Sequence, residues 1–347
     1  MQKGVKFRDR MIESIKTEPV MKETAVLKMK QWGVGFVLTG MCVLGALAQA
    51  FPQKPVRVVI GFPPGGGIDM VARLIAPKLS ESLGQTVVID NRPGANGVLA
   101  MDHVAKSAPD GHTLFLGTLG NLSINPSFYP NLPFSVDKQF VPVTEVASLS
   151  FVLFTNPNVP ANSLPELVAY AKANPGVLNY SSSGAGGLPH LAGELFSAAV
   201  GSKMVHIAYK GSAPSISDVM AGQVQMTFEA AAAGAQQLKA GRLKALGVTG
   251  SKRVAFLPDV PTVQEVVPGF EVLNWYGLVA PAGTPKDTIR RLQQDIAKVM
   301  ALPEIRDKMV ALGTDPVGST PEEFGLYIKS ETTKWGRIIR DGNIRPD

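Results

Sequence analysis

Short apolar runs alternate along the chain with stretches in which apolar residues recur every three or four positions. Residues 56–62 form a β-branched run, and the apolar residues that follow it have helical spacing: Ile68, Val71, Ala72, Ile75, Leu79 and Leu83. This spacing places their side chains on one face of a helix, which Gly84 ends. Residues 86–90 form a second short run. The pattern predicts a strand, a glycine-rich turn, a helix and another strand.

The same alternation continues through the rest of the chain. It predicts a strand over residues 113–117 and a second round of the pattern that starts at residue 179. In that round we expect strands over residues 179–182, 204–207, 224–228 and 245–248, and helices over residues 188–200, 215–221 and 231–238. Strands that alternate with helices favour an α/β fold with mainly parallel sheets, because each helical crossover returns the chain in the same direction.

Two longer apolar runs, residues 143–155 and 271–280, lie where one α/β unit gives way to the other. We interpret them as crossover strands between two lobes, with the last quarter of the chain returning to the first lobe. Lobe 1 is then residues 51–152 plus 273–347, and lobe 2 is residues 153–272. Helices are expected after Ser163, after Thr284 with Pro285, and after Thr320 with Glu323, because these residues are typical of helix starts.

Residues 1–50 have the features of a leader with a signal peptide. Lys28 and Lys30 precede an apolar run over residues 33–47, and Ala48-Gln49-Ala50 matches an A-x-A cleavage site. We therefore expect cleavage after Ala50 and a periplasmic mature protein. The run is shorter than the roughly 20 residues that a membrane span needs. The only cysteine, Cys42, lies inside this leader, so the mature chain has no disulfide or Cys-ligated metal.

The charge of the chain argues against a nucleic-acid partner. The formal net charge is +6, but residues 1–50 hold 8 Lys and Arg against 4 Asp and Glu, which leaves 26 against 24 in residues 51–347. The basic residues of the mature part are scattered among acidic ones, whereas a nucleic-acid surface needs a dense basic patch. The 45% hydrophobic and 18% charged residues are typical of a folded soluble protein.

Two glycine-rich turns each join a strand end to a helix start, at residues 61–69 and 183–187. Backbone N–H groups at such a turn lie at the positive end of the helix dipole, which suits phosphate or carboxylate. The first turn lacks the Gly-Lys-Ser/Thr ending of a nucleotide P-loop, and Met70 stands where a dinucleotide motif starting at Gly65 needs glycine. One such turn is adequately explained as a tight turn, but two equivalent turns favour a small anion held between two lobes.

Motifs for catalysis are absent from the sequence. It contains no Gly-x-Ser-x-Gly, no His-Glu-x-x-His and no paired Cys/His spacing, so we predict no enzyme, no cofactor and no metal site. His190 stands in the first turn of a predicted helix, where it either donates to a carboxylate or caps the helix. Trp275 and Tyr276 either line the cleft or belong to the core. Asp69 is expected to cap its helix, because a bare carboxylate would repel an anion.

Nine stretches of the mature chain resemble the Bug, or TctC-like, extracytoplasmic solute receptors of tripartite tricarboxylate transporters. They occur in the family's order and spacing: GFPPGGGID at 61–69, NRPGANG at 91–97, APDGHT at 108–113, INPSFY at 124–129, NYSSSGAGGLPHL at 179–191, YKGSAP at 209–214, GRLKALGVT at 241–249, LPDVPT at 257–262 and GLVAPAGTP at 277–285. The resemblance implies a two-lobed type II periplasmic-binding-protein fold, the Venus flytrap. It also implies a receptor that captures a small organic carboxylate and delivers it to the integral membrane subunits of the transporter. The alternative is a loaded receptor that signals to a membrane sensor kinase.

The resemblance also implies which residues contact the ligand. One jaw comes from residues 62–69 and the other from residues 182–190, helped by residues 118–121. Ile68, Gly187 and Leu188 replace residues that are often polar in the family, which points to a mono- or dicarboxylate that is less polar than citrate. Glu229 stands where the family often has Asp. The expected substrate-binding residues are Phe62, Pro63, Gly65, Gly66, Gly67, Ile68, Asp69, Thr118, Asn121, Ser182, Ser183, Gly184, Gly187, Leu188 and His190.

Overall fold

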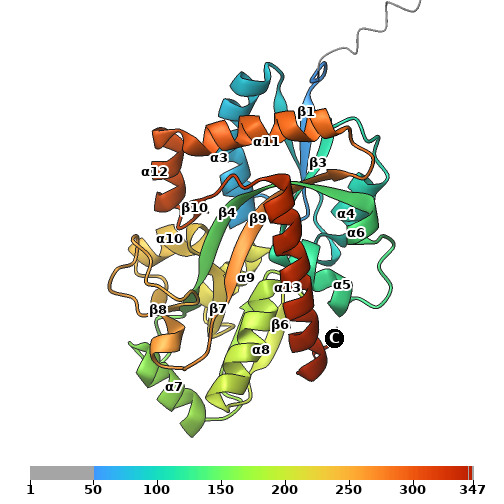
Figure 1. Cartoon of the computed structure of the whole chain (residues 1–347). Coiled ribbons are helices and arrows are strands. Elements are labelled where there is room, and N and C mark those ends of the chain that lie inside the picture. Colours follow the sequence, from blue (N-terminus) through green and yellow to red (C-terminus); the bar gives the residue numbers. More distant parts are fainter. Residues whose placement is uncertain (1–50, 343, 346–347) are drawn as a thin grey trace, which may run out of the picture. The chain divides into compact units, whose positions relative to one another are not determined.

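A computed structural model describes residues 51–342 and 344–345. The expected signal peptide, its cleavage after Ala50 and Cys42 lie outside these residues. Within them, no helix has the length and apolar character needed to cross a membrane. The described chain forms a mixed α/β structure whose strands follow the order β2-β1-β3-β9-β4-β7-β5-β6, and β8 and β10 (Asp315–Pro316) also pair with β4. Figure 1 shows how β4 and β9 pass through the middle of this arrangement.

The first three strands form a parallel group around β1 (Val56–Ile60). This strand pairs in parallel with β2 (Val87–Asn91) on one side and with β3 (Thr113–Thr118) on the other. Helix α3 (Gly67–Leu83) connects β1 to β2, buries its apolar stripe against the sheet and ends at Gly84, whose φ of 72° is left-handed. The predicted strand, turn, helix and strand are therefore present.

A second parallel group forms around β5 (Asn179–Ser182). It pairs in parallel with β6 (Val205–Ala208) and with β7 (Met226–Ala230), and α8 (Leu188–Val200) and α9 (Ser212–Met220) make the crossovers. The two groups have equivalent topologies, because in each the first strand lies between the next two. This is the repeated pattern that the sequence predicts.

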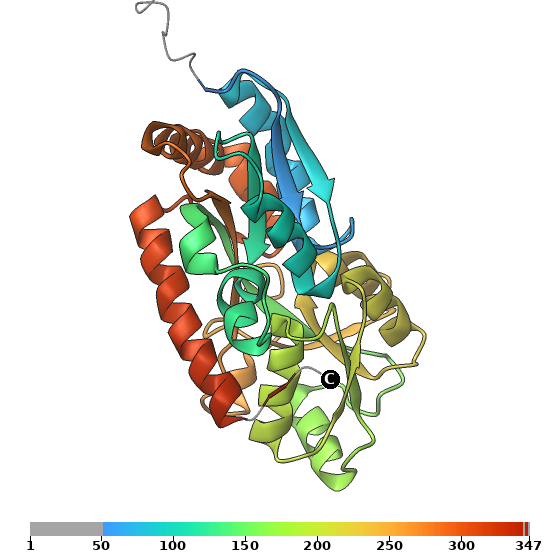
Figure 2. The ribbon, with the colours of Figure 1, turned by 90° about the vertical axis from the view of Figure 1, so that its right-hand side faces the viewer.

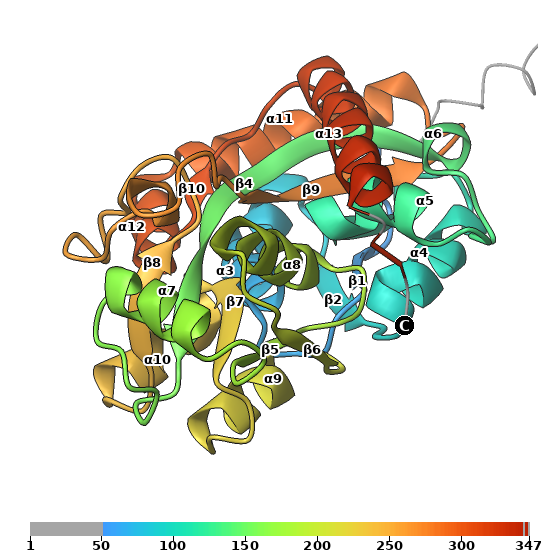
Figure 3. The same ribbon diagram turned by 90° about the horizontal axis from the view of Figure 1, so that it is seen from below.

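Two long strands join the parallel groups. The first part of β4 (Phe140–Thr155) pairs antiparallel with β9 (Leu273–Pro281), and its last residues, from Phe151, pair antiparallel with β7 and β8 (Lys244–Val248). In turn, β9 pairs antiparallel with β3. Viewed from below, β4 curves from the group that contains β1 to the group that contains β7 (Figure 3). The expected crossover strands are thus observed, and the parallel groups are linked by antiparallel strands. The lobe boundaries at residues 152/153 and 272/273 stay a prediction.

The C-terminal helices cover the long strands. Helix α13 (Pro321–Asp341) begins at Thr320, whose hydroxyl and Glu323 form a capping box, and it packs against β4 (Figure 2). The ring of Phe324 meets buried Trp275 of β9 edge to face, with 5.2 Å between ring centroids. Trp275 therefore belongs to the core rather than to a cleft. The remaining helices are α4 (Val98–Ala105), α5 (Asn125–Phe128), α6 (Val136–Gln139), α7 (Leu164–Ala173), α10 (Ala231–Lys239), α11 (Lys286–Ala301) and α12 (Pro303–Ala311).

One detail of the sequence-based expectations differs from the structure. Thr284 does not cap α11, because its hydroxyl donates to the carbonyl of Pro281 and the N-cap residue is Pro285. Helix α12 follows α11 closely. Leu302 is extended, as a residue before proline prefers to be, and Pro303 then begins the short helix α12.

Candidate ligand-binding pocket

A pocket lies where the strands of both parallel groups end. It has an empty volume of about 520 Å³, part of it open to solvent, which is in the size range of small-molecule sites. Thr118 is the last residue of β3 and Ala230 the last of β7, whereas Phe62 and Ser183 closely follow β1 and β5. The lining residues are Phe62, Pro63, Gly66, Gly67, Ile68, Asn96, Thr118, Phe151, Ser183, Gly187, Leu188, Pro189, Ser212, Glu229, Ala230, Asn274 and Tyr276.

Four helices begin at this pocket. The N-cap residues of α3, α8 and α10 are Gly66, Gly187 and Ala230, and α9 starts at Ser212; all four line the pocket. None of these helices has a side-chain hydrogen bond at its cap. The first N–H groups of a helix have no partner within the helix, and they carry the positive end of its dipole. The pocket therefore presents positive potential although the described residues that line it include no Lys, Arg or His.

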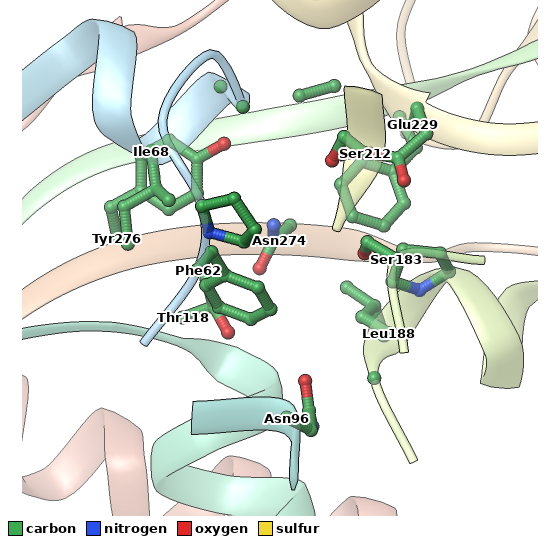
Figure 4. Close-up of a pocket in the computed structure, with 17 residues that line it drawn as sticks. Phe62, Ile68, Asn96, Thr118, Ser183, Leu188, Ser212, Glu229, Asn274 and Tyr276 are labelled. Atoms are coloured by element: carbon green, nitrogen blue, oxygen red, sulfur yellow. Dashed lines mark hydrogen bonds between the residues drawn. The ribbon is translucent and has the colours of Figure 1, made fainter. Parts of the chain in front are cut away.

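The two halves of the pocket approach each other closely. A Cβ atom added to Gly67 at the start of α3 would lie 2.7 Å from the Tyr276 Oη and 2.8 Å from the Ala230 Cβ. Figure 4 shows Ile68 and Tyr276 on one side of the pocket, and Ser212, Glu229, Ser183 and Leu188 on the other. The glycine-rich turns of the two parallel groups thus share one crevice.

Asp69 holds the first glycine-rich turn in place. Its carboxylate accepts hydrogen bonds from the Gly65 N–H at 3.0 Å, from the Arg73 guanidinium at 2.9 Å and from the Asn91 amide at 3.0 Å. Burial acts to raise the pKa of Asp69, but these hydrogen bonds and the Arg73 charge together hold it below its ordinary value. Asp69 does not cap α3 as expected, since the N-cap Gly66 has no side-chain partner. It anchors the turn that precedes the helix.

His190 has the equivalent position in the second turn. Its Nδ1 accepts a hydrogen bond from the Gly186 N–H at 3.1 Å, so this nitrogen carries no proton. Its ring stacks on the ring of His206, with 3.9 Å between centroids. From the other parallel group, the Tyr129 hydroxyl donates to the Ala185 carbonyl at 2.8 Å. His190 therefore shapes the turn by accepting a backbone hydrogen bond.

Asn121 orients two residues that line the pocket. Its Oδ1 accepts hydrogen bonds from the Thr118 N–H at 2.9 Å and from the Thr118 hydroxyl at 3.1 Å. Its Nδ2 donates to the Asn96 carbonyl at 2.7 Å. Because Asn121 is fully buried, these bonds define the edge of the pocket at the end of β3.

Nine of the fifteen residues expected from the sequence line the pocket: Phe62, Pro63, Gly66, Gly67, Ile68, Thr118, Ser183, Gly187 and Leu188. Gly184 lines an adjoining hollow that shares Phe62, Pro63, Asn96 and Ser183 with the pocket. The other five form hydrogen bonds that shape the segments around the pocket; they are Gly65, Asp69, Asn121, Ser182 and His190. Contact between any of the fifteen and a ligand stays a prediction.

Eight lining residues were not among the fifteen: Asn96, Phe151, Pro189, Ser212, Glu229, Ala230, Asn274 and Tyr276. Tyr276, for which the sequence left cleft and core open, is both buried and at the pocket. Ser212 follows the positive-φ Gly211 and begins α9, so a third strand–turn–helix unit was the signal for it. Asn274 and Tyr276 reach the pocket from β9, and only the sheet register places that strand beside β3. Within the described residues, no cluster of three or more His, Cys, Asp or Glu side chains is suited to a metal ion.

Comparison with known proteins identifies a receptor family. Residues 71–344 match the family model described as TctC, the tripartite tricarboxylate transporter family receptor. A protein of a Pseudomonas species, from the tcbD-tcbE intergenic region, is 40% identical over 88% of this chain and 92% of its own length. The protein BugT of Bordetella pertussis is 35% identical over 88% of this chain and 94% of its own length.

Solved structures of similar proteins include two with bound acids. R. palustris Rpa4515 with adipate is 34% identical with a TM-score of 0.83, and it matches 86% of this chain and 100% of its own. MatC from Rhodopseudomonas palustris with bound malate is 31% identical with a TM-score of 0.78, matching 83% of this chain and 100% of its own. The periplasmic binding protein BugD is 32% identical, with a TM-score of 0.81, over 86% of this chain and 100% of its own. These likenesses show the two-lobed periplasmic-binding-protein fold.

Proposed function

Because the chain belongs to the tripartite tricarboxylate transporter receptor family, we propose that it captures a small organic carboxylate for a membrane transporter. The observation that carries this proposal is the convergence of four helix N-termini, none with a side-chain cap, on one pocket. Anions bind at such termini because unpaired N–H groups and the dipole both favour negative charge. The pocket needs no basic side chain to do this.

The ligand class is a mono- or dicarboxylate with an apolar middle. Polar groups at the pocket include the hydroxyls of Thr118, Ser183 and Ser212, and the apolar groups include Phe62, Ile68, Phe151 and Leu188. A carboxylate held by N–H and O–H donors can thus direct a short hydrocarbon segment toward the apolar side. Adipate and malate, the acids bound by the two R. palustris relatives, are therefore the first acids to test.

Binding is by closure of two lobes around the acid. We propose residues 51–152 with 273–347 as one lobe and residues 153–272 as the other, with β4 and β9 as the connecting strands. Both glycine-rich turns contact the ligand, with Gly66 and Gly67 in one lobe and Ser183 and Gly187 in the other. The acid leaves chemically unchanged, so the residues of the pocket bind and orient it and catalyse nothing.

Delivery takes place outside the cytoplasmic membrane. We propose export by a signal peptide cleaved after Ala50, a periplasmic location, and docking on the two integral subunits of a tripartite tricarboxylate transporter. Crosslinking of the acid-loaded protein in membranes, followed by mass spectrometry, should identify those subunits. A sensor kinase recovered in their place would indicate signalling instead of transport.

The binding proposal is tested with protein that has been unfolded, dialysed and refolded to remove bound solute. Adipate, malate and shorter or longer straight-chain acids should include at least one that raises the melting temperature with increasing concentration. A ligand at a hundred times its Kd adds about 2.7 kcal/mol to the stability of the folded state. Sodium chloride at the same ionic strength is the control and should have no such effect. If no acid in the panel raises the melting temperature above that control, the proposed function is wrong.

A further inference from the structure

Glu229 is a buried acid at the wall of the pocket. It is the fourth residue of β7, its side chain is only 3% exposed, and it lines the pocket beside the start of α10. Its Oε2 accepts a hydrogen bond from the Ser212 hydroxyl at 2.8 Å. Its Oε1 has no hydrogen-bond partner among the described residues. A buried carboxylate oxygen left without a partner is costly, so this atom indicates a contact that a ligand would complete.

None of the described residues that line the pocket is a cation that could balance a negative charge on Glu229. Strand β7 packs against β4, β5, α8, α9 and α10. Most ionisable groups on these elements and at the start of α3 have other hydrogen-bond partners: Tyr180 on β5, His190 and Glu194 on α8, Asp218 on α9 and Asp69 on α3. The other two lie away from the end of β7, Glu145 in the first part of β4 and Lys239 in the last turn of α10. Besides Glu229, Tyr276 is the only ionisable residue among the described residues that line the pocket. Burial raises the pKa of Tyr276, so its hydroxyl stays neutral.

This environment favours the neutral form of Glu229. Burial raises the pKa of Glu229 to about 7, although the hydrogen bond from the Ser212 hydroxyl opposes the shift. An anion placed in the same pocket repels an ionised carboxylate, which shifts the equilibrium further toward the protonated acid. A protonated carboxyl also provides what the ionised form lacks, an O–H donor, and bonds from O–H to a carboxylate are short and strong.

Resting on the proposed function, we propose that Glu229 binds the anionic ligand in its protonated form. Oε1–H then donates to a carboxylate oxygen of the ligand, while Oε2 keeps its bond from Ser212. Above neutral pH the proton comes from solvent, so capture of the ligand takes up one proton and release returns it. Glu229 is thereby a specificity-determining residue, because its O–H favours a ligand with a carboxylate oxygen at this position over a ligand with no hydrogen-bond acceptor there.

Proton uptake makes the affinity depend on pH in a defined direction. Below about pH 7 Glu229 is already protonated in the ligand-free protein, and the affinity is constant. Above that value each further pH unit removes the binding-competent form, so the affinity falls about tenfold per unit. The opposite arrangement, an ionised Glu229 paired with a ligand cation, would make the affinity rise over the same range.

Glu145 supplies a matched control. It is also a buried glutamate, and burial raises the pKa of Glu145 to about 7 as well. It lies on β4 opposite Gly277 and does not line the pocket. Glu145→Gln therefore removes a similar titration from the protein without touching the binding machinery, whereas Glu229→Gln replaces the pocket carboxyl by a neutral amide that cannot titrate.

Isothermal titration calorimetry with adipate, and with malate in parallel, measures the affinity at pH 6, 7, 8 and 9. Two buffers with different ionisation enthalpies give the number of protons taken up on binding. The wild type and Glu145→Gln should lose about tenfold in affinity per pH unit above 7, and they should take up close to one proton at pH 8 and 9 but little at pH 6. Glu229→Gln should show no pH dependence and no proton uptake, whatever its affinity. Infrared difference spectroscopy tests the protonation of Glu229 in the wild type without any substitution. Adding adipate at pH 8 should produce a band of a protonated carboxyl.

The outcomes separate the two proposals. A wild type that binds an acid with a flat pH profile, or with an affinity that rises with pH, overturns the role of Glu229 and leaves the proposed function intact. The same conclusion follows if Glu229→Gln folds, binds and keeps the wild-type slope. If the wild type binds neither acid at any pH, the proposed function fails for these dicarboxylates and the inference fails with it.

Discussion

The two glycine-rich turns of the pocket are held by equivalent hydrogen bonds to chemically different side chains. In each, the third residue of the following helix accepts a hydrogen bond from a glycine N–H four positions earlier: Asp69 from Gly65 and His190 from Gly186. Asp69 does this with a charge and His190 with the unprotonated nitrogen of a ring. Neither residue lines the pocket. The comparison shows that the turns need a fixed acceptor, and that the acceptor is kept away from the anion.

The difference follows from the surroundings of each anchor. Asp69 lies beside Arg73, so its charge is paired and directed to the outer side of α3. His190 is stacked on His206 and Tyr180, where an ionised group would be costly to bury. The first turn is therefore held by a network within its own parallel group. The second turn is also contacted by Tyr129 from the other group.

The largest effect is expected from removing the charged anchor. Asp69→Ala leaves the Gly65 N–H without its acceptor and removes one of the two acceptors of the Asn91 amide, which keeps the Phe62 carbonyl. We expect a loss of about 2 kcal/mol in stability and more than tenfold in affinity. Arg73 is half exposed, so the ion pair itself contributes little to this value. Asp287→Ala is the control, because Asp287 is in the first turn of α11 but 90% exposed. Chemical denaturation and calorimetry measure both, and equal effects of the two variants would contradict the anchor role.

An intermediate effect is expected where the two halves of the pocket meet. In Gly67→Ala the new methyl group would lie within 3 Å of the Tyr276 hydroxyl and the Ala230 side chain, so these groups must move apart. We expect about a tenfold loss of affinity, or roughly 1.4 kcal/mol. In Gly66→Ala the nearest atom is the Ser212 Oγ at 3.6 Å, an ordinary contact, and the loss should be clearly smaller. The reverse order would show that the halves do not close in this way.

The smallest effect is expected from a conservative change of the neutral anchor. The amide oxygen of His190→Asn can still accept the Gly186 N–H, and the ring contacts with His206, Tyr180 and Phe128 are what is lost. Affinity should therefore fall less than about fivefold. Asp69→Asn should cost more, because both carboxylate oxygens accept N–H donors, and replacing one of them by NH2 sets a donor against the Gly65 N–H or the Asn91 amide. Affinities of the two variants, measured side by side, sharpen the comparison. If His190→Asn is the more damaging change, the second turn depends on more than a backbone acceptor.

Much of this fold follows from periodicity in the sequence. The strand β5 and the helix α8 have the predicted bounds, and α3 ends at the predicted Gly84, because local propensity and capping agree with the packing there. Strand pairing is different. The antiparallel contacts of β9 with β3 and β4 join residues more than a hundred positions apart, and no local pattern encodes them.

The site was predictable to the extent that it lies on the turns. Four residues of the glycine-rich segments, Gly66, Gly67, Ser183 and Gly187, line one pocket. Asn274 was missed as a lining residue and Tyr276 was left open between cleft and core, since an alternating strand does not reveal which face borders a crevice. The roles of Asp69 and His190 also depend on distances, because the same residue types at a helix start serve equally as caps.

The central claim is that four helix N-termini bind an anion without any basic side chain, and calorimetry of adipate against its neutral diamide tests this most directly. The two compounds have nearly the same length and apolar middle, but only adipate carries charge. The account predicts that adipate binds ligand-free protein at pH 6.5 at least a hundredfold more tightly than the diamide. Equal affinities for the two compounds, or binding of the diamide alone, would contradict it.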